Sequence, residues 1–486
     1  MNVKIVNFLL GKMCYFLAGF MALPVMVAVF YNDQGLKTLF ISLALTIGVG
    51  YLFCAAGKFD PYHDLITNRE GMATVTFTWI LLAALSAVPY VLYGALDPFG
   101  AYFESMSGLT TTGATALTDI ESLPKSILFW RSLTHWIGGL GIIVIFIALL
   151  PQISGGAQHL FYAETTGFTN DKLVPKMKNT ALVLFYIYVI LTLTETILLI
   201  FCGLSPYDAL THSFSSIATG GFSCYNDSVA HFQSATVEMI IAVFMVLSGA
   251  NFSLYYTMMR TGIKTFWKDD EFRGYLLLTF GITFLIMANI CLVQGLSPWE
   301  GFRYSFFQVA SFISTTGFVS YNYDLWPSFA KLCLCILYFT GACVGSTAGG
   351  IKVSRFVVLI KTIGVEMKRV LHHNMLYNVE YNKGILPVFL VASISRFFVI
   401  YIACMIILSL AVAATGVSPL EAIFGVATCI SSIGPGFGPV GAVGNFNHIP
   451  AAGKAALSVA MLLGRLELFT VLVLLRKEFW QKTRNW

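Results

Sequence analysis

Long apolar runs separated by short polar segments dominate the hydrophobic pattern of this chain. A helix needs about 20 apolar residues to cross the hydrocarbon core of a bilayer. The pattern therefore predicts an all-α protein that crosses a membrane about ten times. The apolar runs lie near 8–30, 37–57, 72–95, 127–150, 177–202, 234–260, 274–294, 329–360, 385–414 and 453–475.

Composition and charge agree with a multi-pass membrane protein. Of the 486 residues, 57% are hydrophobic and 11% are charged, whereas soluble domains carry about 25% charged residues. Lys and Arg gather in every second loop and at the C-terminal end, while the 204–233 segment has neither. Because cytoplasmic loops carry the excess of Lys and Arg, we expect these loops and both termini to be cytoplasmic. The formal charge of +5 then reflects topology and not nucleic-acid binding.

One short segment recurs four times on the predicted outer side. Each copy has Ser or Asp followed by Pro, then a short amphipathic stretch, then a glycine, with a spacing of about 100 residues between copies. Ser or Asp before Pro is a helix N-cap signature. A stretch of this length is too short and too polar to cross a membrane, so we expect four re-entrant loops. The pairs are Asp97-Pro98, Ser205-Pro206, Ser297-Pro298 and Ser418-Pro419, and the glycines are Gly113, Gly220, Gly317 and Gly434.

These repeats predict how the chain is organised. Each unit contains an apolar span, a re-entrant segment and a second apolar span, and two further spans precede the first unit. We expect pseudo-fourfold symmetry around a central pore, since non-helical backbone at membrane depth must be buried in protein or line water. The predicted parts are two N-terminal helices at 1–70 and pore repeats at 71–176, 177–270, 271–383 and 384–486.

The residues at the end of each re-entrant helix are predicted to form an ion filter. Four helix C-termini would direct negative dipole ends at one axis, and extended strips beyond them would present carbonyl oxygens to a dehydrated monovalent cation. The strips contain no carboxylates, which hard divalent ions prefer, so potassium fits better. A single copy is better explained as a turn between membrane helices; four matched copies on one membrane face favour a pore. The predicted strips are Thr111-Thr112-Gly113, Ala218-Thr219-Gly220, Thr315-Thr316-Gly317 and Ser432-Ile433-Gly434.

In several motifs the chain resembles the TrkH/KtrB/HKT superfamily of potassium transporters. Within this superfamily it resembles the bacterial TrkH branch, which has two additional N-terminal spans. The motifs are SMSGLTTTGAT (105–115), SSIATGGFS (215–223), SFISTTGFVSY (311–321), ISSIGPGFGPVG (430–441), WIGGLGIIV (136–144) and GSTAGGIK (345–352). The resemblance implies a homodimer in the bacterial inner membrane and a TrkA-like cytosolic ring that binds nucleotide and regulates permeation. Ile433 and Pro435 make the fourth strip depart most from the family pattern, which implies looser selectivity against sodium.

A glycine-rich stretch interrupts the eighth apolar run. Glycines lower helix stability by about 1 kcal/mol each, so an unwound segment is expected within GACVGSTAGGIKVSR, 341–355. The resembling family has its intramembrane gate at this place. Tight helix packing through small residues is the alternative interpretation; a phosphate-binding loop is excluded because Ile351 separates Gly350 from Lys352. The predicted gate residues are Gly345, Ser346, Thr347, Gly349, Gly350, Lys352 and Arg465.

Arg465 lies in the middle of the last apolar run, where a charged residue is functional or paired. The resemblance implies that it projects into the cavity beneath the filter and helps to hold the glycine-rich segment; an ion pair, for example with Glu467, is the alternative. We expect Arg131, His135, Glu195 and Arg396 to form polar bonds between helices.

Glu104, inside the first re-entrant helix, is predicted either to support the filter from behind or to attract cations at its mouth. The sequence therefore predicts a channel-like pore for potassium uptake, with a symporter coupled to protons or sodium as the alternative. No catalytic constellation and no cofactor site appear in the sequence, so no enzymatic activity is expected.

Overall fold

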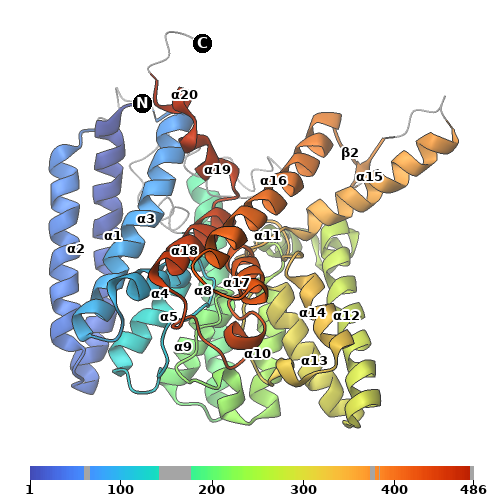
Figure 1. Ribbon diagram of the computed structural model, residues 1–486, viewed down its shortest axis with the longest axis horizontal. Helices are drawn as coiled ribbons and strands as arrows, with labels where there is room; N and C mark the ends of the chain where they lie inside the picture. Colours follow the sequence, from blue (N-terminus) through green and yellow to red (C-terminus); the bar gives the residue numbers. More distant parts are fainter. Residues whose placement is uncertain (60–65, 142–176, 373–377, 383, 482–486) are drawn as a thin grey trace.

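The computed structural model describes residues 1–59, 66–141, 177–372, 378–382 and 384–481, and its regular structure is almost entirely helical (Figure 1). The predicted all-α class is confirmed. Within the described residues one small antiparallel hairpin pairs β1 (Glu380–Tyr381) with β2 (Gly384–Ile385).

The two N-terminal helices lie side by side at one edge of the molecule (Figure 1). They are α1 (Val3–Tyr31) and α2 (Leu36–Ala56), and both are long and apolar enough to span a membrane. Glycine allows their close approach, because a side chain at Gly11 would overlap Cys54 of α2. These helices pack against α3 and α5 at the periphery, so they flank the repeats without lining their centre.

Four repeats of similar design follow. The first contains α3 (Asn68–Tyr93), α4 (Pro98–Leu109) and α5 (Lys125–Gly139). The second contains α8 (Met177–Phe201), α9 (Pro206–Ile217), α10 (Ala235–Ser248) and α11 (Phe252–Thr261). The third contains α12 (Asp270–Gln294), α13 (Pro298–Ile313), α14 (Ser328–Leu337) and α15 (Val353–Leu371). The fourth contains α16 (Val388–Ala413), α17 (Pro419–Ser431), α18 (Ala451–Arg465) and α19 (Phe469–Leu472), with α20 (Lys477–Trp480) after it.

The second long helix of a repeat is interrupted in three of the four units. Six described helices are unbroken candidate spans, whereas α10 and α11 meet at 86° and α18 and α19 at 113°. The expectation of continuous spans at 234–260 and 453–475 is therefore wrong. The run at 329–360 is also divided, into α14 and α15, and part of the run at 127–150 lies outside the described residues.

The re-entrant helices α4, α9, α13 and α17 form where the Ser/Asp-Pro signature predicts them. Their lengths are 12, 12, 16 and 13 residues. In each, the N-cap side chain accepts a backbone N–H of the first turn, as Ser297 does from Glu300 N at 3.3 Å. The third helix is one turn longer than the first two, as its sequence predicts.

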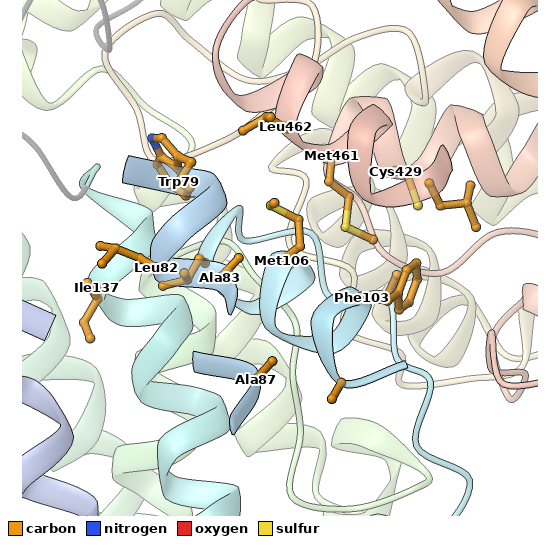
Figure 2. Packing of buried hydrophobic residues seen from close by; sticks show 14 of the residues in the cluster. Trp79, Leu82, Ala83, Ala87, Phe103, Met106, Ile137, Cys429, Met461 and Leu462 are labelled. Atoms are coloured by element: carbon orange, nitrogen blue, oxygen red, sulfur yellow. The ribbon is translucent and has the colours of Figure 1, made fainter. Parts of the chain in front are cut away.

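The repeats close into a circle. At two junctions the second helix of one repeat packs on the re-entrant helix of the next, α5 on α9 and α10 on α13, whereas the third and fourth repeats meet through α15 and α16. The same contact between α18 and α4 joins the fourth repeat to the first. Figure 2 shows the apolar side chains at this junction, where Met461 and Leu462 of α18 approach Met106 of α4 beside Trp79. Burial of this surface fixes the last repeat against the first.

Candidate functional site

The chain segments that follow the four re-entrant helices meet in a closed ring. At each contact a glycine of one segment lies so close to a carbonyl oxygen of the next that an added methyl group would overlap it or press on it. The order of contacts runs from repeat 1 to 2, 3, 4 and back to 1, so the four segments share one centre. The pairs are Gly113 with Gly220 O, Gly221 with Thr316 O, Gly317 with Ile433 O and Gly434 with Thr112 O.

The second segment differs by one residue from its prediction. Gly221, at φ +80°, occupies the place that Gly113 has at +83°, whereas Gly220 has no positive φ. The backbone bond from Gly220 N to Ser215 O corresponds to the bond from Thr112 N to Ser107 O. The predicted strip Ala218-Thr219-Gly220 is therefore out of register.

The four filter segments are the residues with equivalent backbone conformation in the four repeats. Their first residues have φ values of 54° to 58°, so each segment begins with a left-handed residue and not with the extended backbone that was expected. The filter segments are 111–113, 219–221, 315–317 and 432–434.

Cavities lie on both sides of the ring. One cavity, of about 70 Å³, is lined by all four ring glycines together with the loops that follow them. The other, of about 90 Å³, lies on the side of α11 and α18 and is lined by Thr347, Gly349, Arg465 and their neighbours. The ring therefore lies between two cavities.

A non-helical segment fills the path next to the ring. Residues 341–352, the Gly-rich loop, separate α14 from α15, as the glycine content predicts. Thr347 Oγ1 donates to Ile217 O at 3.0 Å and accepts from Thr219 Oγ1 at 3.3 Å. Gly349 N donates to Thr315 Oγ1 at 2.8 Å. The loop is thus bonded directly to the second and third filter segments.

The Gly-rich loop is also held by charged groups. Lys352 is buried, and its ammonium donates back to Ala348 O and to Gly349 O, so it stabilises the turn within the loop. Glu271 at the start of α12 accepts Val344 N at 2.8 Å and Ser354 N at 3.1 Å. Sequence reasoning missed Glu271, although an acidic residue at the start of a long apolar run was a usable signal.

Arg465 lies at the junction of the ring and the Gly-rich loop. Its guanidinium donates to Thr347 O at 3.0 Å, to Thr111 Oγ1 at 3.3 Å and to Gly139 O at 2.8 Å. The alternative partner, Glu467, is instead paired with Arg355 of α15 at 2.7 Å. One arginine therefore connects the loop, the first filter segment and the end of α5.

The other polar residues at membrane depth have different roles. His135 stacks on Phe222 at 4.0 Å, behind the second filter segment. Glu195 is buried on α8, and its carboxylate lies within reach of the hydroxyl of Ser216 on α9. Arg396 is exposed and donates to Ala392 O of its own helix, so the predicted bond between helices is not formed in the described part of the chain.

Glu104 lies behind the filter, away from the mouth. It is fully buried, and its carboxylate accepts Ala116 N at 2.7 Å and forms an ion pair with Arg131 at 2.7 Å. Tyr323 and Tyr338, which the sequence analysis did not identify, hold the chain after Gly434 by donating to Gly436 O and Pro435 O.

These features define a class of protein. Membrane-spanning helices surround a ring of converging backbone, which separates two cavities and is contacted by a non-helical loop. This combination is that of a multi-pass membrane transport protein built around one central path.

Comparison with known proteins identifies the family. The TrkH family, described as a cation transport protein, matches residues 47–484. The Trk system potassium uptake protein TrkH of Escherichia coli (strain K12) is 35% identical over 491 residues, covering 99% of this chain and 100% of the relative. TrkG of the same strain is 31% identical over 99% of both chains. The crystal structure of the potassium transporter TrkH from Vibrio parahaemolyticus matches with a TM-score of 0.90 and 31% identity, over 99% of this chain and 100% of that one. The chain belongs to the TrkH family.

Proposed function

We propose that this protein takes up potassium through a channel-like pore whose filter consists of backbone carbonyl oxygens. The observation that carries the proposal is the closed ring, in which the main-chain oxygens of Thr112, Gly220, Thr316 and Ile433 each lie against a glycine of the preceding repeat. Oxygens held in this way can replace the hydration shell of a monovalent cation. The names of the relatives support potassium as the ion.

Main-chain oxygens favour potassium over a divalent ion at this place. The filter segments have Thr, Gly, Ser and Ile side chains and no carboxylate, and divalent cations prefer carboxylate ligands. The fourth segment carries Ile433 where the first and third carry Thr112 and Thr316. Its different chemistry agrees with weaker discrimination against sodium than four identical segments would give.

The Gly-rich loop and Arg465 are proposed to gate the path. The loop lines the second cavity and is bonded to Thr219 and Thr315 beside the ring. The guanidinium of Arg465 places a positive charge in the same cavity, where it opposes cations while the loop is in this position.

Family membership supports three further parts of the proposal. They are a homodimer, a location in the bacterial inner membrane with cytoplasmic termini, and a TrkA-like cytosolic ring that binds nucleotide and moves the loop. The relatives are components of a Trk system, which agrees with a separate regulatory partner.

The proposal is tested by reversal potentials of the purified protein in liposomes. We expect a current that follows the potassium gradient alone. A reversal potential that moves with an imposed proton or sodium gradient would support the coupled symporter instead. Gly113→Ser is expected to lower the potassium-to-sodium permeability ratio, because its Cβ would overlap Gly220 O. An unchanged ratio in this variant contradicts the filter assignment.

The proposed gate is tested by deletion of residues 346–350, which contain most of the contacts between the loop and the filter. We expect potassium flux to increase in the absence of the cytosolic partner. Flux that still requires the partner after this deletion contradicts a gating role for the loop.

A further inference from the structure

One position on each re-entrant helix faces the chain beyond the filter. It lies eight residues before the residue whose carbonyl oxygen takes part in the ring, as residue 104 lies before residue 112. The four residues at this position differ in chemistry: they are Glu104, His212, Gln308 and Gly425, before Thr112, Gly220, Thr316 and Ile433 respectively.

In the first repeat this position holds the residues just beyond the ring glycine. Glu104 accepts Ala116 N at 2.7 Å and Thr115 Oγ1 at 3.0 Å. These residues follow Gly113 by three and two positions. A carboxylate that accepts a backbone N–H makes a strong, directional bond. Glu104 therefore fixes where the first filter segment leaves the ring.

In the second repeat the equivalent residue, His212, and Arg131 of the first repeat together hold the chain beyond the filter. The ring of His212 bonds Ser223 Oγ at 3.0 Å, and the guanidinium of Arg131 donates to Ser223 O at 2.7 Å. The same guanidinium lies 3.5 Å from the ring centre of Phe222, the residue after Gly221. Arg131 thus holds the chain just beyond the second filter segment by a hydrogen bond and by stacking.

The third and fourth repeats have neutral residues at this position. Gln308 donates to Phe318 O at 3.4 Å, and Ser311 Oγ donates to the same oxygen at 2.7 Å. Gly425 has no side chain, and the two tyrosines described above hold the fourth segment instead. Of the four equivalent positions, the first alone has a carboxylate, and its partner Arg131 reaches the chain beyond the second filter segment.

We propose that the buried Glu104–Arg131 ion pair is a positioning device that couples filter segments 1 and 2 and thereby sets selectivity between potassium and sodium. This inference rests on the proposed function. Glu104 and Arg131 are 0% and 2% exposed, and Arg131 also lines the cavity that contains the ring glycines. Glu104 therefore neutralises a positive charge beside the cation path while both residues hold the backbone.

The two partners have complementary chemistry that cannot be exchanged. A carboxylate only accepts hydrogen bonds and a guanidinium only donates them. Glu104 must accept Ala116 N, and Arg131 must donate to Ser223 O. Lysine in place of Arg131 keeps the charge, but its compact ammonium lacks the planar fork that bonds two oxygens and stacks on a ring.

The test measures the potassium-to-sodium permeability ratio of purified Arg131→Lys in liposomes, together with its melting temperature. We expect the ratio to fall about tenfold, the range that one charge-assisted hydrogen bond supplies. Glu104→Gln, which keeps the shape of the side chain, is the second variant and is expected to change the ratio in the same direction.

The matched control is Arg303→Lys. Arg303 of α13 makes a two-bond ion pair with Glu238 of α10, with both distances at 2.6 Å, and none of its described bonds reaches the chain beyond the ring. Weakening this ion pair by Arg303→Lys should lower the melting temperature and leave the permeability ratio unchanged.

Two further outcomes would overturn the inference. In the first, Arg131→Lys lowers the melting temperature as the control does and leaves the ratio at the wild-type value. In the second, the reversed pair Glu104→Arg with Arg131→Glu restores wild-type selectivity, since the backbone bonds would then be irrelevant. If Gly113→Ser also leaves the ratio unchanged, the proposed function fails as well; if only Gly113→Ser changes it, the filter stands and this inference alone is wrong.

Discussion

The filter ring and the Gly-rich loop are both rich in glycine, but they use it differently. In the ring, Gly113, Gly221 and Gly317 each lie against a carbonyl oxygen of a neighbouring repeat. In the loop, the nearest atom to an added methyl at Gly345 belongs to the Asn251 side chain, and at Gly350 it is 3.3 Å away. All of these glycines are left-handed, but the ring glycines also permit close contact between the backbones of neighbouring repeats, whereas Gly345 and Gly350, at φ +71° and +68°, permit a turn.

This difference separates a fixed structure from one that can move. A ring segment cannot shift without displacing the backbone of the next repeat. Toward the ring the Gly-rich loop is held by hydrogen bonds of Thr347, Gly349 and Arg465, and a typical hydrogen bond contributes only about 1 kcal/mol net. Water or another conformation can replace such bonds one at a time.

The largest expected effect comes from filling the ring. In Gly317→Ala the new methyl group overlaps Ile433 O at φ +84°. We expect potassium uptake by cells to fall about 100-fold, since overpacking and a left-handed alanine each cost on the order of 1–3 kcal/mol. Gly295→Ala is the control, because Gly295 has φ +70° and no atom within 4 Å of the added methyl. Normal uptake by the Gly317 variant would show that the ring is not crowded.

Removing the charge that joins the ring and the loop should have the next largest effect. In Arg465→Gln the bonds to Thr347 O and Gly139 O are weakened. We expect flux through the purified protein without a partner to increase about tenfold, since a hydrogen bond from a charged group contributes about 1.5–3 kcal/mol. Arg369→Gln, at an exposed pair with Glu366, should leave the flux unchanged. A lower flux in the Arg465 variant would mean that this residue supports conduction.

A single neutral bond of the loop should matter less. Thr347→Val keeps the shape of the side chain and removes the bond to Ile217 O. We expect basal flux to increase about fivefold, which corresponds to about 1 kcal/mol. Thr340→Val is the control, because Thr340 follows the end of α14 and its hydroxyl donates to Leu337 O, with no other hydrogen bond to the residues that the structure describes. Equal fluxes in the two variants would show that the hydrogen bond of Thr347 does not hold the loop in place.

The smallest effect is expected at Ser346. Its hydroxyl donates to Cys343 O inside the loop and makes no described contact with the filter. Ser346→Ala should therefore change basal flux by less than about twofold, a range typical of surface substitutions. A large increase in the same liposome assay would show that the internal structure of the loop, and not its contact with the ring, holds it in place.

Several local features were predictable because they depend on neighbouring residues. Ser297 followed by Pro298 and Glu300 specifies a capped helix wherever the segment lies. The glycines of 341–352 predict a break in a helix for the same reason. The breaks at 249–251 and 466–468 were not predicted, because the mean hydropathy of each run is high enough for one continuous span.

The sequence by itself determined the apolar spans, the four capped re-entrant helices and the interruption before α15, because each follows from local hydrophobicity and backbone propensity. Only the tertiary structure decided that Gly221 and not Gly220 closes the ring, that Arg465 contacts Thr347 and that Glu104 pairs with Arg131. These contacts join residues that are distant along the chain. They depend on the order in which four repeats pack around one centre, and no local pattern records that order.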